Sequence, residues 1–352
     1  MYFYKISKRF YIKEIYESKR FVFDYRRSKN YNQLIVSKID RQIRSNKSGG
    51  CYMENNMMIC GENPELKLFL QACILQDEHL DCKIFQFSEK IAPSVSQAVA
   101  SAKFSDNFKL ESTLHPNWSE LQLVLLGTPP EEFVEIEGEN ATRRWVQLVI
   151  NQAMANGFKG KICVVMPDDY LWVYSALRFS GLSASNVFGL GTMGLSETVA
   201  RLLGDRLDIG SDPIYANVLG TSSDAFIAWS RAQIAGNSLL SIVAQDNSLF
   251  DQALLDQITK EYRDQMILAH DVVTVICLQR IIRAVFFDHP ILVPLTHEIE
   301  YANEKIAVSE PVVVSKQGVA VMTKLVLSEE EQQRYLEVKQ IILDEIKDLK
   351  KS

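Results

Sequence analysis

The pattern G-x-G-x-x-G, typical of loops that hold the pyrophosphate of a dinucleotide cofactor, is formed in mid-chain by Gly189, Gly191 and Gly194. Such a loop follows a strand, opens a helix, and has an acidic residue about 20 positions further on for the ribose. Here the preceding apolar stretch is only Val187-Phe188, and the next strand-like run, residues 214–219, ends without a carboxylate. The pattern is therefore weak as a cofactor loop, and the surrounding elements must decide its meaning.

Length and composition are those of a globular protein large enough for two domains. The chain has 352 residues, of which 47% are hydrophobic and 23% charged. Its six cysteines form no C-x-x-C pair and have no metal-ligand spacing, so we infer no metal site. A chain of this size needs no disulfides, and we expect reduced thiols and a cytoplasmic location.

Charge is unevenly distributed. Residues 1–52 carry 13 Lys or Arg against 4 Asp or Glu, together with seven tyrosines, whereas the whole chain has a net charge of −6. We interpret residues 1–52 as an extension that is either foreign to the native protein or weakly ordered. Basic and aromatic residues together can bind nucleic acid, but only this segment suggests it, and we do not expect such a partner. No apolar run reaches the roughly 18 residues of a membrane span.

The rest of the chain shows two patterns of predicted secondary structure. Strand-like and helical stretches alternate between about residues 55 and 185, among them a helix over 141–155 and a strand over 161–165 that is ended by Pro167. This alternation predicts a doubly wound parallel sheet of the Rossmann type. After residue 190 the pattern becomes α+β. It includes a helix over 195–207, a strand over 214–219, a mainly helical stretch over 254–287, an antiparallel meander of 312–314, 319–322 and 325–327, and a final helix. Ser328 and Glu331 form a capping box for that last helix. We place the domains at 53–188 and 189–352.

Several segments in this order and spacing resemble the NAD-dependent L-lactate and malate dehydrogenases. The resemblance extends over roughly residues 57–350 and is carried by residues 179–192, 215–224, 228–230, 234–236 and 325–331. It implies a dinucleotide-binding domain followed by an α+β substrate domain, with NAD as cofactor and assembly into dimers or tetramers. In this family the mid-chain glycines join the domains and lead into a helix that carries two active-site residues.

The catalytic positions that the resemblance implies hold other residue types. The histidine that exchanges a proton with the substrate oxygen corresponds to Ser222, which has no pKa near neutrality. The aspartate that orients this histidine corresponds to Leu195, and the arginine that grips the substrate carboxylate corresponds to Thr198. A shifted clamp at Arg201 is the one alternative on the same helix. The family's asparagine beside the nicotinamide corresponds to Met166.

The cofactor positions are also altered. The family's first glycine loop corresponds to residues 61–66, where only Gly61 is kept and two glutamates stand where the pyrophosphate would lie. Gln86 replaces the acid that binds the ribose, and Gly127 precedes a lid loop, 128–139, that is rich in acid. An acidic lid repels anionic substrates. We therefore expect NAD binding to be weakened or lost.

The five histidines lie outside the matched catalytic segments: His79, His115, His270, His289 and His297. We expect each to be a surface or packed polar residue. His270 is the best candidate for a relocated base.

Two functions stay open. The first is a catalytically silent family member with a binding, assembly or regulatory role, as a homo-oligomer or with an active relative. The alternative is a divergent NAD-dependent oxidoreductase that acts on the CH–OH group of a 2-hydroxy acid.

Overall fold

The structure is a computed structural model that describes residues 55–244, 251–266, 271–321 and 325–351. Its contacts group residues Glu54–Ser352 into one compact unit, which is the subject here. The predictions for residues 1–52 and for His270 lie outside the described residues.

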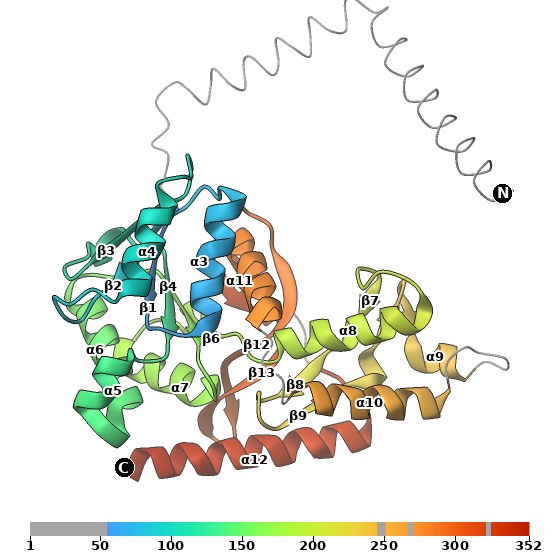
Figure 1. The fold of residues 1–352 in the computed structure, drawn as a ribbon. Helices are drawn as coiled ribbons and strands as arrows, with labels where there is room; N and C mark the ends of the chain where they lie inside the picture. The colour runs from blue at the N-terminus through green and yellow to red at the C-terminus, as the bar shows by residue number, and fades with distance from the viewer. Residues whose placement is uncertain (1–54, 245–250, 267–270, 322–324, 352) are drawn as a thin grey trace, which may run out of the picture. The chain divides into compact units, whose positions relative to one another are not determined.

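Short apolar runs form a parallel sheet in the order β3-β2-β1-β4-β5-β6 (Figure 1). Its strands are β1 (Asn56–Cys60), β2 (Asp81–Phe85), β3 (Lys109–Thr113), β4 (Leu123–Gly127), β5 (Lys161–Val165) and β6 (Val187–Gly189). Met57 pairs with Cys82 on one side and with Leu123 on the other, so β1 lies between β2 and β4. Because the strand order reverses between β1 and β4, a crevice is expected at their carboxyl ends, where such sheets bind ligands.

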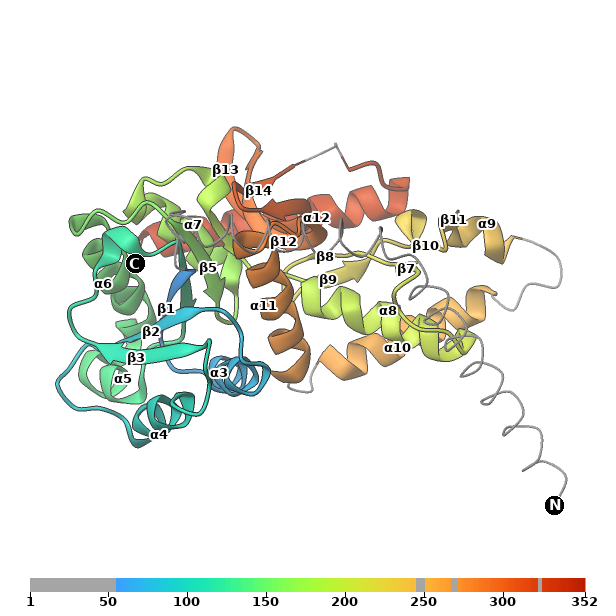
Figure 2. The same cartoon turned by 90° about the horizontal axis from the view of Figure 1, so that it is seen from above.

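Helices cover both faces of this sheet (Figures 1 and 2). They are α3 (Pro64–Gln76), α4 (Pro93–Ala102), α5 (Glu131–Glu137), α6 (Ala141–Ala155), α7 (Asp169–Ser180) and, from later in the chain, α11 (Asp271–Phe286). Alternate strand residues enter different cores, as the two-residue period of a strand requires. Met58 and Val124 pack in the core that includes α6 and α7, whereas Met57 and Leu123 pack in the core that includes α3 and α11.

The sheet continues beyond β6 with antiparallel strands. These are β12 (Ile291–Tyr301), β13 (Glu304–Ser315), β14 (Gly318–Ala320), β8 (Val218–Gly220) and β9 (Ala225–Ile227). Thr296 of β12 pairs with Gly189 of β6, and Ser309 of β13 pairs with Gly220 of β8. The prediction of a doubly wound parallel sheet followed by an α+β part is thus confirmed.

Two sequence predictions in this half are wrong in detail. The run 214–219 is not one strand, because β7 (Ile214–Tyr215) and β8 belong to different sheets. The meander consists of β12, β13 and β14, and residues 325–327 are not a strand. The long strand β12 was not predicted. β12 pairs with β13 along its whole length. Such pairing between two segments is poorly predicted from the local spacing of apolar residues.

A third core lies among the helices that follow the parallel sheet. It joins Val199 and Leu203 of α8 (Met193–Leu207) to Leu255 and Tyr262 of α10 (Gln252–Met266). The short helix α9 (Leu239–Val243) lies beside this core. A small sheet also lies there, formed by β7, β10 (Gln233–Ile234) and β11 (Asn237–Ser238).

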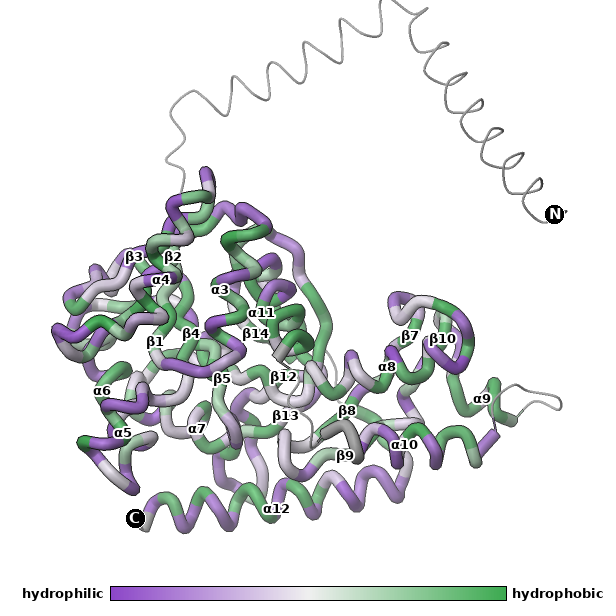
Figure 3. The backbone as a smooth tube through the Cα atoms, viewed as in Figure 1, coloured by the Kyte–Doolittle hydropathy of each residue, from purple (hydrophilic) through white to green (hydrophobic). Residues whose placement is uncertain are grey.

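The last helix, α12 (Glu329–Lys351), begins at the predicted capping box. The Ser328 amide donates to a Glu331 carboxylate oxygen and the Glu331 amide donates to Ser328 Oγ, each at 3.3 Å. Apolar and polar stretches alternate along α12 in Figure 3, as expected of a helix with one buried stripe. An ion pair between Arg334 and Asp224 ties this helix to the β8–β9 hairpin.

Candidate functional site

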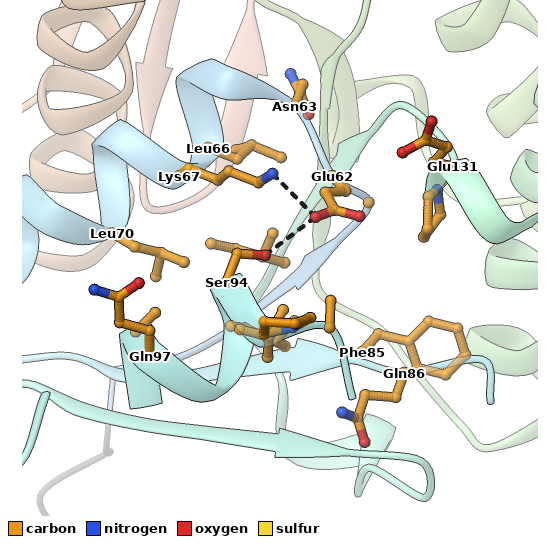
Figure 4. Close-up of a pocket in the computed structure, with 18 of the residues that line it drawn as sticks. Glu62, Asn63, Leu66, Lys67, Leu70, Phe85, Gln86, Ser94, Gln97 and Glu131 are labelled. Carbon is orange, nitrogen blue, oxygen red and sulfur yellow. Dashed lines mark hydrogen bonds and ion pairs between the residues drawn. The ribbon is translucent and has the colours of Figure 1, made fainter. Parts of the chain in front are cut away.

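A cavity of about 480 Å³ lies at the carboxyl ends of β1 and β2, between α3 and α4 (Figure 4). Its volume falls within the roughly 300–1,000 Å³ of small-molecule sites. Gly61 and Gln86, two of the predicted cofactor-binding residues, are among the residues that line it. Gln86 directly follows β2, and its backbone N–H donates to the Thr113 carbonyl oxygen at 2.9 Å.

Gly61 keeps the role of the first glycine of a dinucleotide loop. Its φ of +127° suits glycine, and a Cβ at this position would lie 2.5 Å from the Thr128 carbonyl oxygen. The next residue closes this contact, because the Glu62 amide donates to Thr128 O at 2.9 Å and Thr128 Oγ1 donates back to Glu62 O at 3.2 Å. The loop after β1 is therefore held tightly against the loop after β4.

The two lost glycines are replaced by side chains that fill the crevice between β1 and β4. A Cβ added at Gly127 would lie 2.3 Å from Asn63 Oδ1 and 2.6 Å from Leu66 Cδ1. In a dinucleotide loop the second glycine allows the backbone to approach the pyrophosphate, and the third allows close packing of helix on strand. Here Asn63 and Leu66 occupy that space.

Asn63 is anchored on the far side of this crevice. Its Nδ2 donates to the Val165 carbonyl at the end of β5, at 3.0 Å, and to Glu65 Oε2 at 3.1 Å. The residue is 7% exposed, and no donor among the described residues reaches its Oδ1. Phosphate oxygens need hydrogen-bond donors, whereas this position offers an acceptor.

Glu62 brings negative charge to the start of α3. Lys67 Nζ lies 3.0 Å from its carboxylate, and Ser94 Oγ donates to it at 3.3 Å (Figure 4). Helix N-termini favour anions, and here the carboxylates of Glu62 and Glu65 already bring negative charge to the start of α3. The residues present therefore do not fit the pyrophosphate of NAD, and we derive no chemistry through that cofactor.

The positions implied for catalysis lie in different surroundings. Ser222 is exposed at the turn between β8 and β9, whereas Met166 is buried in the core with α6 and α7. Leu195 packs against the core of α8 and α10. Thr198 is buried, and its Oγ1 donates a 3.0 Å hydrogen bond to the Gly194 carbonyl oxygen of the same helix. None of these four side chains carries an acid or a base.

A second cavity, of about 610 Å³, lies beside Thr198 between α8, α11 and β12. The alternative clamp Arg201 lines it and is engaged with Asp205, with the Nη1–Oδ2 distance 2.7 Å. Arg280 of α11 also lines it and forms an ion pair with Glu197. These arginines are thus already engaged with carboxylates of the same chain.

The G-x-G-x-x-G pattern runs from the last residue of β6 to the second residue of α8. Gly191 has a φ of +54°, and a Cβ there would lie 2.4 Å from Ser309 Oγ of β13. Its amide donates to Asp169 Oδ2 at 2.7 Å, and Thr296 Oγ1 donates to Asp169 Oδ1 at 2.8 Å. Gly191 therefore permits close packing of this segment on β12 and β13.

Asp169 is a buried carboxylate that the sequence analysis did not single out. Burial raises its pKa to about 6, while the hydrogen bonds from Gly191 and Thr296 act in the opposite direction. It joins α7, the segment after β6 and β12, which are distant in the sequence. The sequence shows that Asp169 follows Pro167 by two residues, but it does not show which groups Asp169 bonds.

The four described histidines lie in two kinds of surroundings. His79, His115 and His289 are exposed. His297 is 4% exposed in β12, with Nε2 3.5 Å from Glu310 Oε1, and Glu310 also accepts a hydrogen bond from Tyr335 at 2.7 Å. This cluster lies between β12, β13 and α12.

The described cysteines are buried free thiols: Cys60, Cys73, Cys82, Cys163 and Cys277. Burial raises the pKa of each thiol, which disfavours the reactive thiolate form. Within the described ranges, no group of three or more His, Cys, Asp or Glu side chains could hold a metal ion. No helix in that part of the chain is long and apolar enough to cross a membrane.

Comparison with known proteins agrees with this architecture, although no family model matches the chain. An L-lactate dehydrogenase of Streptococcus pneumoniae (strain Hungary19A-6) is 24% identical over 269 residues, which cover 72% of this chain and 80% of that protein. The same enzyme of strain 70585 is equally similar.

Solved structures share the fold. A lactate dehydrogenase from a Medee basin deep-sea metagenome library superposes with a TM-score of 0.73 at 20% identity, covering 84% of this chain and 99% of that one. Malate dehydrogenase of Plasmodium falciparum, solved with NADH, has a TM-score of 0.71 at 14% identity, covering 83% and 98%.

The fold and its cleft define a Rossmann-type α/β protein. In sequence and in fold the chain is similar to lactate and malate dehydrogenases.

Proposed function

We propose that this chain is a catalytically silent member of the family, which keeps the fold for binding or regulation and no longer uses a dinucleotide. The observation that carries the proposal is the filled crevice between β1 and β4. Asn63 and Leu66 lie over Gly127, and the Asn63 amide is tied to Val165 across the crevice. A dinucleotide that crossed this crevice would have to displace these two side chains.

The catalytic positions support the same proposal. Hydride transfer to or from a 2-hydroxy acid needs an acid or base at the substrate oxygen, and loss of such a group costs roughly 10² to 10⁴ in rate. Ser222, Leu195 and Thr198 supply no acid or base, no orienting carboxylate and no cation. Simultaneous loss of all three functions compounds the cost.

The lid adds an electrostatic argument. Helix α5 in this loop begins with Glu131 and Glu132, both of which line the cavity. The nearby Arg144 is engaged in an ion pair with Glu137. An anionic 2-oxo acid would therefore meet carboxylates at this entrance.

The alternative, a divergent NAD-dependent oxidoreductase of 2-hydroxy acids, is favoured by one observation. The cavity beside β2 persists and still includes Gly61 and Gln86. Such an enzyme would have to hold its cofactor in a geometry different from that of the family loop.

Titration with NADH, followed by its fluorescence, combined with a turnover assay on a panel of 2-oxo acids, separates the two. We expect no saturable binding at millimolar NADH and no turnover. Saturable binding together with oxidation of NADH by any 2-oxo acid would refute the silent-member proposal.

Assembly into a homo-oligomer, or with an active relative, and the cytoplasmic location are part of this proposal. The family resemblance supports both. Light scattering coupled to size-exclusion chromatography measures the mass, and a monomer at micromolar concentration would argue against a homo-oligomer.

A further inference from the structure

A buried carboxylate and a buried histidine meet where the last helix docks on the sheet. The side chains of Glu310 in β13 and His297 in β12 are 14% and 5% exposed, and His297 Nε2 lies 3.5 Å from Glu310 Oε1. Tyr335 of α12 donates to Glu310 Oε2 at 2.7 Å. Burying two ionisable groups is costly unless each finds its partners, so their protonation states matter for the docking of α12.

The histidine ring lies between two acceptors. Its Nδ1 is 3.3 Å from the Leu295 carbonyl oxygen of the same strand. Its Nε2 faces the Glu310 carboxylate and has no close hydrogen-bond partner among the described residues. A neutral imidazole has one N–H, so one of its nitrogens would face an acceptor without a proton. The imidazolium has an N–H on both nitrogens, and only this form suits both neighbours.

Glu310 is suited to be the counter-charge. Burial acts to raise the pKa of Glu310. The contacts with His297 and Tyr335 and the charge of Lys339 outweigh burial, and the pKa lies below its usual 4.5. The stabilisation by Glu310 is therefore complete above pH 4.5 and is lost only as pH falls through the lower folded pKa. Between about pH 5 and 8 the carboxylate stays ionised, and histidine is the side chain whose charge changes there.

The other charged groups around this pair are identified by their contacts. Lys339 Nζ lies 3.8 Å from the centroid of the Tyr335 ring, and burial lowers the pKa of Lys339 while Glu310 acts in the opposite direction. The rest are engaged with one another: Arg178 and Lys305 with Glu298, Arg334 with Asp224, and Tyr170 with Glu345. Glu310 is thus the acid next to the His297 ring.

The docking of α12 also holds the hairpin of β8 and β9. The rings of Tyr335 and Phe226 of β9 have their centroids 6.2 Å apart, and Arg334 forms an ion pair with Asp224. The turn of this hairpin carries Ser222. A change in how firmly α12 is docked therefore reaches the hairpin.

We propose that His297 and Glu310 form a pH-sensitive lock, which holds α12 while the imidazolium faces the carboxylate and loosens the helix when the ring loses its proton. Deprotonation leaves a buried carboxylate without its counter-charge and one ring nitrogen facing an acceptor. The helix and the β8–β9 hairpin then open more often. The lock operates whether or not the chain binds a dinucleotide.

The first test reads the ring itself. NMR of the full chain with ¹⁵N-labelled histidine distinguishes a ring with two N–H groups from a ring with one, and His297→Gln identifies the signal. Both nitrogens of His297 should carry hydrogen at pH 6 and only one at pH 8. A neutral ring at pH 6, or the same charge at both pH values, would overturn the proposal.

The second test reads the helix. Hydrogen exchange followed by mass spectrometry, corrected for the intrinsic effect of pH, compares residues 333–346 of α12 with residues 145–153 of α6. The relative protection of α12 should fall about tenfold from pH 6 to pH 8, because a charge-assisted contact is lost. Residues 221–230 of the hairpin should follow α12. Glu310→Gln should abolish the pH dependence, since its amide can donate to a neutral ring.

Two control variants leave the pair intact. Lys339→Gln removes the lysine beside Glu310, and Glu300→Gln removes an exposed carboxylate from the strand that carries His297. Both should retain the change in relative protection. A pH dependence that persists in Glu310→Gln, or that disappears in either control, would assign the effect to other groups and refute the lock.

Discussion

The Nδ2 atom of Asn63 donates a 3.0 Å hydrogen bond to the carbonyl oxygen of Val165. This bond runs from the loop after β1 to the end of β5, across Gly127 at the end of β4. It places an amide side chain where dinucleotide-binding folds have only backbone and cofactor.

Replacing Asn63 with aspartate, which has the same shape, should destabilise the protein by about 3 kcal/mol at pH 8. The carboxylate would face the Val165 carbonyl and Glu65 instead of donating to them. The loss should be smaller at pH 5, where a protonated aspartate can again donate. Urea unfolding at both pH values measures the difference, with the exposed Asn117→Asp as the matched control. Equal losses in the two variants would contradict the role of this bond.

Gly127→Ala should destabilise the fold by about 1–3 kcal/mol, because its Cβ would overlap Asn63 Oδ1 and Leu66 Cδ1. In an Asn63→Gly background the same substitution should cost measurably less, since one of the two overlaps is removed. Gly210→Ala is the control, because a Cβ at Gly210 would contact nothing within 4 Å. Additive losses in the double variant would show that Asn63 does not fill this space.

Asp169 should make stability fall as pH rises. Burial raises its pKa from the usual 3.8 to about 6 in the folded state, so the folded protein holds this proton more tightly than the unfolded chain. Its contribution is complete below about pH 4 and is lost as pH rises through about 6, by on the order of 3 kcal/mol.

Asp169→Asn removes this titration, so its stability should decline less than that of the parent between pH 4 and pH 7. Chemical unfolding at the two pH values tests this, with the exposed Asp106→Asn as control. Parallel curves for the parent and Asp169→Asn would disprove the assignment.

Restoring the family's catalytic groups should not by itself restore activity. Ser222→His, Leu195→Asp and Thr198→Arg together should give no NADH oxidation with pyruvate, because the crevice stays filled. Adding Asn63→Gly and Leu66→Gly should produce saturable NADH binding, read by fluorescence. Turnover in the first variant alone would show that the filled crevice is not the barrier to the cofactor.

Local patterns in the sequence were sufficient for much of the fold. The helix over 141–155 and the strand over 161–165 have the predicted bounds, because a continuous apolar period and a clear stop at Pro167 mark them. The capping box of Ser328 and Glu331 was also predicted, since both partners lie within one turn of helix.

Residue types alone carried the prediction of altered chemistry. Ser222, Leu195 and Thr198 have no acid, base or cation in any conformation, so the positions that the resemblance implies predict the loss of the family's usual roles. The sequence likewise determined that only Gly61 of the cofactor loop is kept.

The tertiary structure decided how the side chains at the altered positions are packed. Asn63 and Leu66 could be read as missing glycines, but their positions over Gly127 and the bond to Val165 arise only when β1, β4 and β5 lie side by side. The partners of Asp169 and the pairing of β12 with β13 are non-local in the same way. Periodicity reports which face of an element is buried, whereas the identity of the contacting group depends on segments that meet only in the folded chain.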